Sequence, residues 1–206
     1  FKEKPRPEDA FSNVINAGLY VIEPEALALV PEGEKYDFSK QLFPKLLEMD
    51  WPIYGKKIDG VWFDVGSPSE LIRAQQELIC NRESLPFPMP RGQVIGENGF
   101  EFEDCNSDGE NLGSVLSSEV KVGKNSMISN SLIMSKTIVG SNCNITETVI
   151  GQNVSIEDSC SIYNCVIGDN VKIGSLAHVD YDVKIGNNTM IEGLVYIPPL
   201  SRIGNN

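Results

Sequence analysis

The segment Ile150-Gly151-Gln152-Asn153-Val154-Ser155-Ile156 decides the fold, because it places two isoleucines six residues apart with a glycine and an asparagine between them. Outward from this segment, an aliphatic residue recurs at the same interval from Leu116 to Ile203. Most intervals are six residues, and three are five: Ile128 to Ile133, Ile145 to Ile150, and Ile162 to Ile167. The shorter intervals lie 17 residues apart, so the larger unit is a coil of three short strands.

Glycine and asparagine mark the turns between these strands. Glycine follows the aliphatic residue at Gly123, Gly140, Gly151, Gly168, Gly174, Gly186 and Gly204, and asparagine often stands two residues later, at Asn125, Asn142, Asn153, Asn170, Asn188 and Asn206. Both residue types tolerate positive φ angles, so we expect them at corners. One aliphatic side chain per hexad would point inward, and a single coil cannot bury that face alone. Residues 115–206 are therefore predicted to form a parallel β-helix.

The composition excludes several kinds of partner. With a formal net charge of −12 and a sequence pI of about 4.5, the surface would repel nucleic-acid phosphates and anionic lipid, so we expect neither nucleic acid nor membrane. The sequence has no apolar run of transmembrane length and no signal peptide. Its five cysteines match no zinc pattern, which predicts reduced thiols and a cytoplasmic location. The chain starts at Phe1 without a methionine, so we expect a part of a longer protein.

Residues 1–84 have the pattern of a mixed α/β domain. An apolar run predicts a buried strand over 14–22, and a helix is predicted from Pro24 to Val30. Asp37 would cap a further helix, which Pro44 would kink or split. Asp59-Gly60 predicts a hairpin turn between strands at 53–58 and 61–65.

A second capping signal and a change of composition follow. Ser67, Pro68 and Glu70 form a capping box that predicts a helix with Leu71, Ala74, Leu78 and Ile79 on its buried face. Four proline and glycine residues then suggest a linker over 85–92. Residues 97–113 are acidic and show no clear hexad, so we expect a loop there. We assign 85–114 to a linker and the start of the β-helix.

Three short motifs carry a resemblance to a known family. They are Glu3-Lys4-Pro5, Asn16-Ala17-Gly18-Leu19-Tyr20, and the turn from Trp62 to Pro68. Each is weak alone, but their order and their position ahead of a hexapeptide-repeat tail are specific. The chain resembles the sugar-1-phosphate nucleotidyltransferases, or NDP-sugar pyrophosphorylases. This resemblance implies that 1–84 is the C-terminal portion of a Rossmann-like nucleotidyltransferase domain, and that the β-helix is left-handed.

The same resemblance implies roles for individual residues. Glu3 would accept hydrogen bonds from sugar hydroxyls, and Lys4 would contact the sugar phosphate. Asn16 and Ala17 would line the sugar pocket, and Asp64 would be one of two carboxylates that hold Mg²⁺. In the reaction, a phosphate oxygen of the sugar-1-phosphate attacks the α-phosphorus of a nucleoside triphosphate and pyrophosphate leaves. Such chemistry depends on positioning and charge neutralisation, for which a lysine and a metal-binding carboxylate are suited.

One departure from the family pattern limits this expectation. The glycine-rich G-x-G-T-R-L loop that cradles the triphosphate is absent from these 206 residues, as is the second metal carboxylate. We therefore expect this chain alone to be inactive, and neither the base nor the sugar can be read from it.

Two other functions stay open at this point, together with a prediction about assembly. In a bifunctional enzyme, the β-helix would acetylate an amino sugar with acetyl-CoA, with His178 as general base. In a regulatory or scaffolding homologue, the solenoid would mediate assembly without catalysis. If the protein is a nucleotidyltransferase, we expect a homo-oligomer formed through the β-helix.

Overall fold

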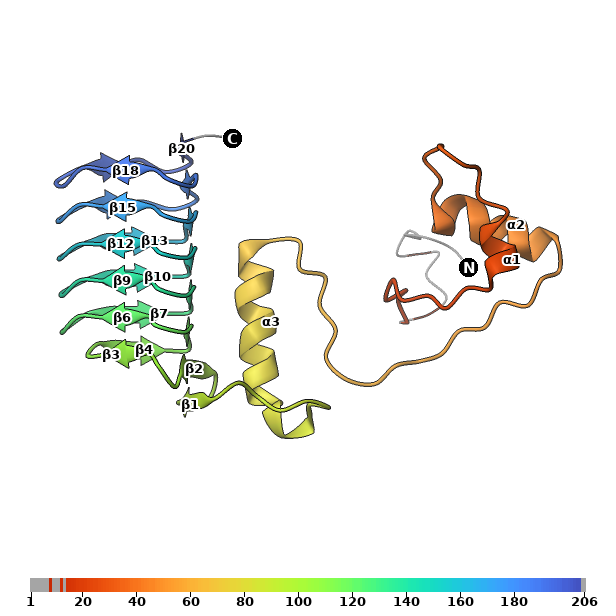
Figure 1. Cartoon of the computed structure of the whole chain (residues 1–206), viewed down its shortest axis with the longest axis horizontal. Coiled ribbons are helices and arrows are strands. Elements are labelled where there is room, and N and C mark those ends of the chain that lie inside the picture. The colour runs from red at the N-terminus through yellow and green to blue at the C-terminus, as the bar shows by residue number, and fades with distance from the viewer. Residues whose placement is uncertain (1–7, 9–11, 13, 205–206) are drawn as a thin grey trace. The chain divides into compact units, whose positions relative to one another are not determined.

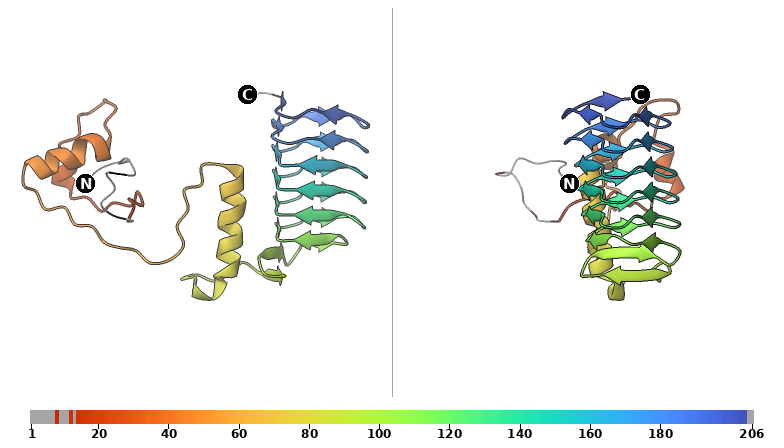
Figure 2. Two further views of the ribbon diagram at one scale, coloured as in Figure 1. Left: turned by 180° about the vertical axis from the view of Figure 1, so that it is seen from behind. Right: turned by 90° about the vertical axis from the view of Figure 1, so that its left-hand side faces the viewer.

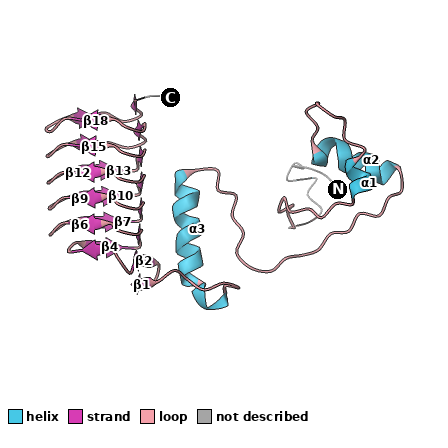
Figure 3. Ribbon diagram, viewed as in Figure 1, coloured by secondary structure: helices cyan, strands magenta, loops and turns pink. Residues whose placement is uncertain are grey.

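The computed structural model describes residues 8, 12 and 14–204, and the chain divides into two compact units between Trp62 and Phe63 (Figure 1). In its described residues the first unit contains the helices α1 (Pro24–Leu27), the π-helical turn η2 (Phe38–Leu42) and α2 (Phe43–Glu48). The second unit contains α3 (Pro68–Cys80), the 3-10 turn η3 (Arg82–Ser84) and a stack of short strands (Figure 3).

The helices of the first unit begin where the sequence predicts. Pro24 stands in the first turn of α1, although that helix ends at Leu27 rather than at Val30. The Asp37 carboxylate accepts a hydrogen bond from the Lys40 backbone N–H at 3.0 Å, which confirms the predicted cap. The predicted split at Pro44 is also confirmed, because a π-helical turn ends at Leu42 and α2 starts at the next residue.

The strands predicted in the first unit are wrong. Residues 14–22 and the predicted hairpin at 53–65 run as irregular chain, and apolar side chains there face solvent, Val21 among them. A strand is stable when a neighbouring strand accepts and donates its backbone hydrogen bonds. The described residues of the first unit offer no such neighbour, so a strand-like composition alone does not produce a strand.

Helix α3 opens the second unit with the predicted cap. The Ser67 hydroxyl accepts a hydrogen bond from the Glu70 backbone N–H at 3.2 Å, and Pro68 occupies the first turn. Ile72 is buried in a cluster with Leu132 and Val149 of the strand stack. The helix is therefore held against the outer face of the solenoid, where a side-chain bond from Gln76 Nε2 to the Gly113 carbonyl oxygen, 2.7 Å long, adds a polar contact.

The strands form three sheets, and each coil of the chain contributes one strand to each sheet (Figure 2). Sheet I comprises β1 (Gly92–Ile95), β2 (Gly99–Phe102), β5 (Val115–Leu116), β8 (Leu132–Ile133), β11 (Val149–Ile150), β14 (Val166–Ile167), β17 (Lys184–Ile185) and β20 (Arg202–Ile203). Sheet II comprises β4 (Glu110–Leu112), β7 (Met127–Ser129), β10 (Asn144–Thr146), β13 (Ser161–Tyr163), β16 (His178–Val179) and β19 (Tyr196–Ile197). Sheet III comprises β3 (Asn106–Ser107), β6 (Lys121–Val122), β9 (Ile138–Val139), β12 (Ser155–Ile156), β15 (Lys172–Ile173) and β18 (Met190–Ile191).

Parallel pairing in strict register produces the core. Ile150 pairs with Ile133 on one side and with Ile167 on the other, and all three are fully or almost fully buried. Burial of one such side chain stabilises the fold by about 1.5–3 kcal/mol, so the aliphatic columns dominate the stability. The predicted parallel β-helix is confirmed, and α3 is an addition that the repeat pattern does not reveal.

Buried hydroxyl groups connect successive coils at one corner of the solenoid. The Ser114 hydroxyl accepts the Ser131 N–H at 3.0 Å, and the Ser131 hydroxyl accepts the Thr148 N–H at 3.0 Å. The Thr148 hydroxyl in turn accepts the N–H of Cys165 at 3.2 Å. Each of these hydroxyls also donates to a carbonyl, as Thr148 does to Thr146 at 2.8 Å. This hydroxyl column satisfies backbone groups that would otherwise be buried without partners.

The acidic loop predicted at 97–113 is wrong, because this segment is the first coil of the solenoid. Glu101, Ser107 and Asn111 occupy the register positions of Leu116, Val122 and Ile128. The Asn111 amide donates to the Glu101 carboxylate at 3.1 Å, and both side chains are buried. A polar end coil is suited to close an apolar core, and its polar inward residues explain why an aliphatic pattern fails to detect it.

Candidate functional site

Two of the predicted substrate-binding residues, Asn16 and Ala17, lie in a turn. Hydrogen bonds of the Asn16 side chain stabilise this turn. The Asn16 side-chain oxygen accepts the N–H of Gly18 at 2.9 Å, and its amide nitrogen donates to the hydroxyl of Tyr20 at 2.7 Å. Gly18 has a φ of 74°, a conformation that glycine adopts without steric cost. The predicted Glu3 and Lys4 lie outside the described residues.

Tyr20 links this turn to the helices of the first unit, a role that our sequence reasoning missed. Its ring packs edge-on against Phe43 with a centroid separation of 5.0 Å, and Phe38 lies at 6.1 Å. The spacing of four residues between Asn16 and Tyr20 is the signal that could have suggested the contact. The Asn16 amide is therefore held by a tyrosine that the aromatic cluster positions.

Trp62, the first residue of the turn motif at 62–68, contacts the motif at Asn16 to Tyr20. Its indole Nε1 donates a hydrogen bond to the Ala17 carbonyl oxygen at 3.3 Å. The tryptophan is 43% exposed, so it does not belong to the core of the described residues. Trp62 and Ala17 lie 45 residues apart in the sequence, and this bond brings them together within the first unit.

Asp64, the predicted metal ligand, lies at the start of the second unit. Its side chain is exposed, and its backbone carbonyl oxygen accepts the N–H of Gly66, the residue before the Ser67 cap, at 2.8 Å. Across residues 8, 12 and 14–204, no group of three or more His, Cys, Asp or Glu side chains could hold a metal ion. Asp64 could supply one oxygen ligand to Mg²⁺, which takes one or two carboxylates together with substrate phosphates.

His178, the predicted acetyltransferase base, lies on the outer face of sheet II. Its ring is exposed and stacks on Tyr196 with a centroid separation of 5.4 Å and an interplanar angle of 29°. The neighbouring Asp180 carboxylate accepts a hydrogen bond from the Tyr196 hydroxyl at 3.0 Å, which raises the pKa of that phenol. The carboxylate is therefore bonded to the tyrosine and not to the imidazole.

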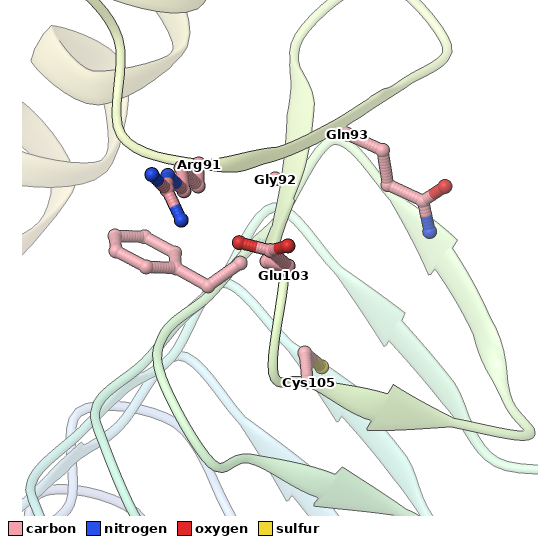
Figure 4. A pocket seen from close by; sticks show the side chains of 6 residues that line it. Arg91, Gly92, Gln93, Glu103 and Cys105 are labelled. Atoms are coloured by element: carbon pink, nitrogen blue, oxygen red, sulfur yellow. The ribbon is translucent and has the colours of Figure 1, made fainter.

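A hollow lies at the first coil of the solenoid (Figure 4). It measures about 570 Å³ and is lined by Arg91, Gly92, Gln93, Phe102, Glu103 and Cys105. Burial, together with the nearby carboxylates of Glu101 and Asp104, raises the pKa of the Cys105 thiol to about 12. This thiol is therefore protonated near neutral pH and is a poor nucleophile.

In residues 8, 12 and 14–204, no helix is long and apolar enough to cross a membrane.

Comparison with known families assigns both parts of the chain. Residues 1–80 match the nucleotidyl transferase model, and residues 111–178 match the GMPPB C-terminal domain. Residues 164–199 match the bacterial transferase hexapeptide model of six repeats. The hexapeptide match indicates that the parallel β-helix is left-handed, as the sequence predicts.

Curated relatives are nucleotidyltransferases that differ in their base. The chain is 36% identical over 94 residues to a UTP–glucose-1-phosphate uridylyltransferase of Synechocystis sp., covering 46% of this chain and 24% of the relative. It is 32% identical over 157 residues to a glucose-1-phosphate adenylyltransferase of Clostridioides difficile, covering 65% and 40%. It is 30% identical over 131 residues to a mannose-1-phosphate guanylyltransferase of Mycobacterium tuberculosis, covering 62% and 36%. The chain thus spans between a quarter and two fifths of the length of these relatives.

Solved structures give a weaker likeness. The acetyltransferase domain of PglB from Neisseria gonorrhoeae is 18% identical with a TM-score of 0.32, over 52% of this chain and 55% of that one. A score of this size carries no argument about function. The family models match by residue range instead: residues 1–80 are similar to a nucleotidyl transferase domain, residues 111–178 to the GMPPB C-terminal domain and residues 164–199 to the bacterial hexapeptide repeats, and the curated relatives are sugar-1-phosphate nucleotidyltransferases.

Proposed function

We propose that this chain is part of an enzyme that converts a sugar-1-phosphate and a nucleoside triphosphate into an NDP-sugar and pyrophosphate. The hydrogen bond from Trp62 Nε1 to the Ala17 carbonyl carries the proposal, because it joins two of the three motifs on which the resemblance depends. The nucleotidyl transferase match over residues 1–80 supports the same assignment. The relatives use uridine, adenosine and guanosine nucleotides, so the proposal leaves the base and the sugar open.

Each site residue has a role in this proposal. Glu3 and Lys4 would bind the sugar and its phosphate, and the turn at Asn16 and Ala17 would border the sugar pocket. The positioning of this turn by Tyr20 and Trp62 supports that role, because a preorganised turn loses little entropy when a sugar binds. Asp64 would supply one ligand to Mg²⁺, an ion that neutralises phosphate charge in reactions of this class.

The exposed apolar residues of the first unit agree with a larger domain. The side chains of Val14, Ile15, Leu19 and Val21 are each at least 66% exposed. In an enzyme of the length of the relatives, other parts of the nucleotidyltransferase domain would cover these side chains. We place the boundary of that domain at residue 84 and the aliphatic coils of the β-helix at 115–206, after the polar first coil.

Location and assembly complete the proposal. All five cysteines are free, which supports a reducing compartment such as the cytoplasm. We also propose that the protein is a homo-oligomer whose copies meet through the β-helix.

The test uses the intact protein as its source cell produces it. Pyrophosphate release is measured with a panel of sugar-1-phosphates and each nucleoside triphosphate in the presence of Mg²⁺. Asp64→Asn should lower kcat/KM by roughly 100-fold or more, as the loss of one electrostatic group commonly does. Asp59→Asn, an equally exposed carboxylate five residues away, is the matched control and should keep activity. An absence of pyrophosphate with every pair would refute the proposal, and an active Asp64→Asn variant would remove the assigned metal role.

The two alternatives are distinguished by separate measurements. The acetyltransferase alternative requires acetyl-CoA-dependent transfer that fails in His178→Ala, and unaltered transfer in this variant would count against it. The open setting of His178, stacked on Tyr196, gives no specific support to that role. A scaffold would release no pyrophosphate at all, and it would have no need of Glu3, Lys4 or Asp64. Turnover by residues 1–206 alone would contradict our expectation that this chain lacks the triphosphate site.

A further inference from the structure

Two neighbouring side chains of helix α3 contact two different parts of the second unit. Ile72 is buried against Leu132 and Val149 on the outer face of sheet I. The next residue, Arg73, places its guanidinium carbon 5.5 Å from the centre of the Phe63 ring. Consecutive side chains on a helix point in directions about 100° apart, so one helix can contact the solenoid with one residue and the chain ahead of it with the next.

The packing of α3 on the solenoid fixes the backbone that carries Arg73. Besides the apolar contact of Ile72, the Gln76 amide donates to the Gly113 carbonyl oxygen at 2.7 Å and to the Asn130 side-chain oxygen at 3.1 Å. Ile72 and Gln76 are four residues apart and therefore share one side of the helix. Figure 1 shows the helix running beside the coils. The β-helix thus sets the position from which Arg73 reaches Phe63.

The guanidinium of Arg73 is also oriented from within the helix. Its Nη1 lies 3.5 Å from Oε1 of Glu70, three residues earlier in the first turn of α3. An ion pair between exposed side chains contributes little to stability, because water screens it. The carboxylate instead draws the guanidinium toward the start of the helix, where Phe63 lies. A cation over the face of an aromatic ring is attracted by the negative charge of that face.

Phe63 directly precedes Asp64, the residue that would bind Mg²⁺ in the proposed reaction. In the part of the chain that the structure describes, the Asp64 carboxylate has no hydrogen bond or ion pair, so its place depends on its backbone. After Asp64, the backbone turns through the 2.8 Å bond from the Gly66 N–H to the Asp64 carbonyl and enters the cap at Ser67. Before Asp64, the contact of Phe63 with Arg73 fixes the chain. The carboxylate is therefore held from both sides.

We propose that Arg73 is a positioning residue for nucleotidyl transfer: through Phe63 it holds the turn that carries Asp64, from a helix whose position the β-helix sets. The inference rests on the proposed function and adds to it a residue outside the three motifs. Residues behind a metal ligand commonly orient that ligand, and their loss weakens metal binding. Arg73 contacts neither the metal nor a substrate in this role.

The test uses the intact protein and a set of matched variants. Arg73→Gln removes the positive charge and Arg73→Lys keeps it, and both new residues are good helix formers, so α3 should fold in each. Phe63→Leu keeps an apolar side chain and removes the aromatic face. Arg82→Gln is the control, because it makes the same chemical change at the other end of α3, where the guanidinium donates to the Ile79 carbonyl at 3.1 Å.

The first measurement is hydrogen exchange of the backbone amides at 63–66, which requires no catalysis. We expect the Gly66 amide to exchange about two- to fivefold faster in Arg73→Gln, as the loss of one exposed cation–π contact implies, and Arg73→Lys to restore most of the protection. The second measurement is the Mg²⁺ concentration for half-maximal pyrophosphate release. It should rise by a similar factor in Arg73→Gln, while the KM for the sugar-1-phosphate stays unchanged.

A double-mutant cycle shows whether Arg73 acts through Phe63. The variant Arg73→Gln/Phe63→Leu should be no more affected than the more affected single variant, because both substitutions remove the same contact. Arg82→Gln should match the wild type in every measurement.

Four results would overturn the proposal. They are unchanged exchange in Arg73→Gln, an equal change in Arg82→Gln, full additivity in the double variant, and a loss of activity with wild-type exchange, which would mean that Arg73 contacts a substrate. If the wild type releases no pyrophosphate, the proposed function fails. Faster exchange in Arg73→Gln would in that case still show that Arg73 holds the turn, so the two failures are distinguishable.

Discussion

Replacement of Thr148 by valine isolates the contribution of the hydroxyl column. Thr148 is fully buried, and its hydroxyl accepts the N–H of Cys165 at 3.2 Å while donating to the Thr146 carbonyl at 2.8 Å. Valine has almost the same shape, so the substitution leaves no cavity and the loss is confined to hydrogen bonding. Thr146 keeps a partner for its carbonyl, the N–H of Asn164 at 2.8 Å.

The size of the stability loss in Thr148→Val depends on the Cys165 N–H, which loses its hydrogen-bond acceptor. The Cys165 N–H would be buried and unsatisfied, a state that costs about 1–3 kcal/mol. We expect a loss of about 2 kcal/mol in the free energy of unfolding of the solenoid, out of a total of roughly 5–15 kcal/mol for a domain. At roughly 2–4 °C for each kcal/mol in a chain of this size, the melting temperature should fall by about 4–8 °C.

The assay is unfolding in urea, monitored by circular dichroism. The free energies of unfolding of wild type and variant are compared with the same dependence on urea concentration for both. Thr146→Val is the matched control: the chemical change is the same and the position lies two residues away, but its half-buried hydroxyl accepts from the Ser129 hydroxyl and not from a backbone N–H. The control should change stability by less than about 0.5 kcal/mol. Equal losses in both variants, or a stable Thr148→Val, would refute the reasoning and imply that water or a coil shift satisfies the Cys165 N–H.

Three further predictions concern backbone packing, thiol reactivity and the pH dependence of stability. In Gly140→Ala the new Cβ would lie 2.8 Å from the Asp158 backbone nitrogen of the next coil, so we expect a loss of about 1–3 kcal/mol by thermal unfolding, whereas Gly66→Ala, with open space around it, should be nearly neutral. Cys80 is exposed and should react with a thiol reagent at pH 8. Cys165 is buried, and burial raises its pKa to about 11, so it should react only after the chain unfolds. Fast labelling of Cys165 in the native state would contradict this prediction. Because the pKa of Cys165 is higher in the folded chain than that of an ordinary cysteine, the unfolded chain loses the Cys165 proton first, and the free energy of unfolding should fall as the pH rises from about 9 to about 11.

Most of the solenoid can be predicted from the sequence, because one physical requirement repeats there. Every coil must place an aliphatic residue inward, so the interval from Ile150 to Ile156 and its repeats define strands, corners and core together. The prediction fails at the first coil, where Glu101 and Asn111 replace aliphatic residues by pairing with each other. Local capping signals also succeed, as at Ser67, because the bond forms within three residues.

What the sequence does not reveal depends on contacts between distant segments. The packing of α3 on sheet I requires Leu132 and Val149 to be outward apolar residues, and the repeat pattern does not separate them from core positions. In the candidate site, the motif residues Asn16 and Ala17 were identified by resemblance, whereas the contact with Trp62 is a tertiary one. The strand predicted at 14–22 fails for the same reason, since pairing is a property of two segments and not of one.

The polar first coil has a consequence for the behaviour of this protein at high concentration. A solenoid of in-register parallel strands has the backbone geometry of a fibril, and its open ends could template the addition of another molecule. At this end, β1 pairs antiparallel with β2, and the Gln93 amide donates to the Glu101 carboxylate at 3.3 Å. An incoming coil of parallel strands would meet a reversed strand and a buried carboxylate in place of an aliphatic column. The first coil therefore acts as a stop that keeps end-to-end polymerisation from starting at the N-terminal edge of the stack.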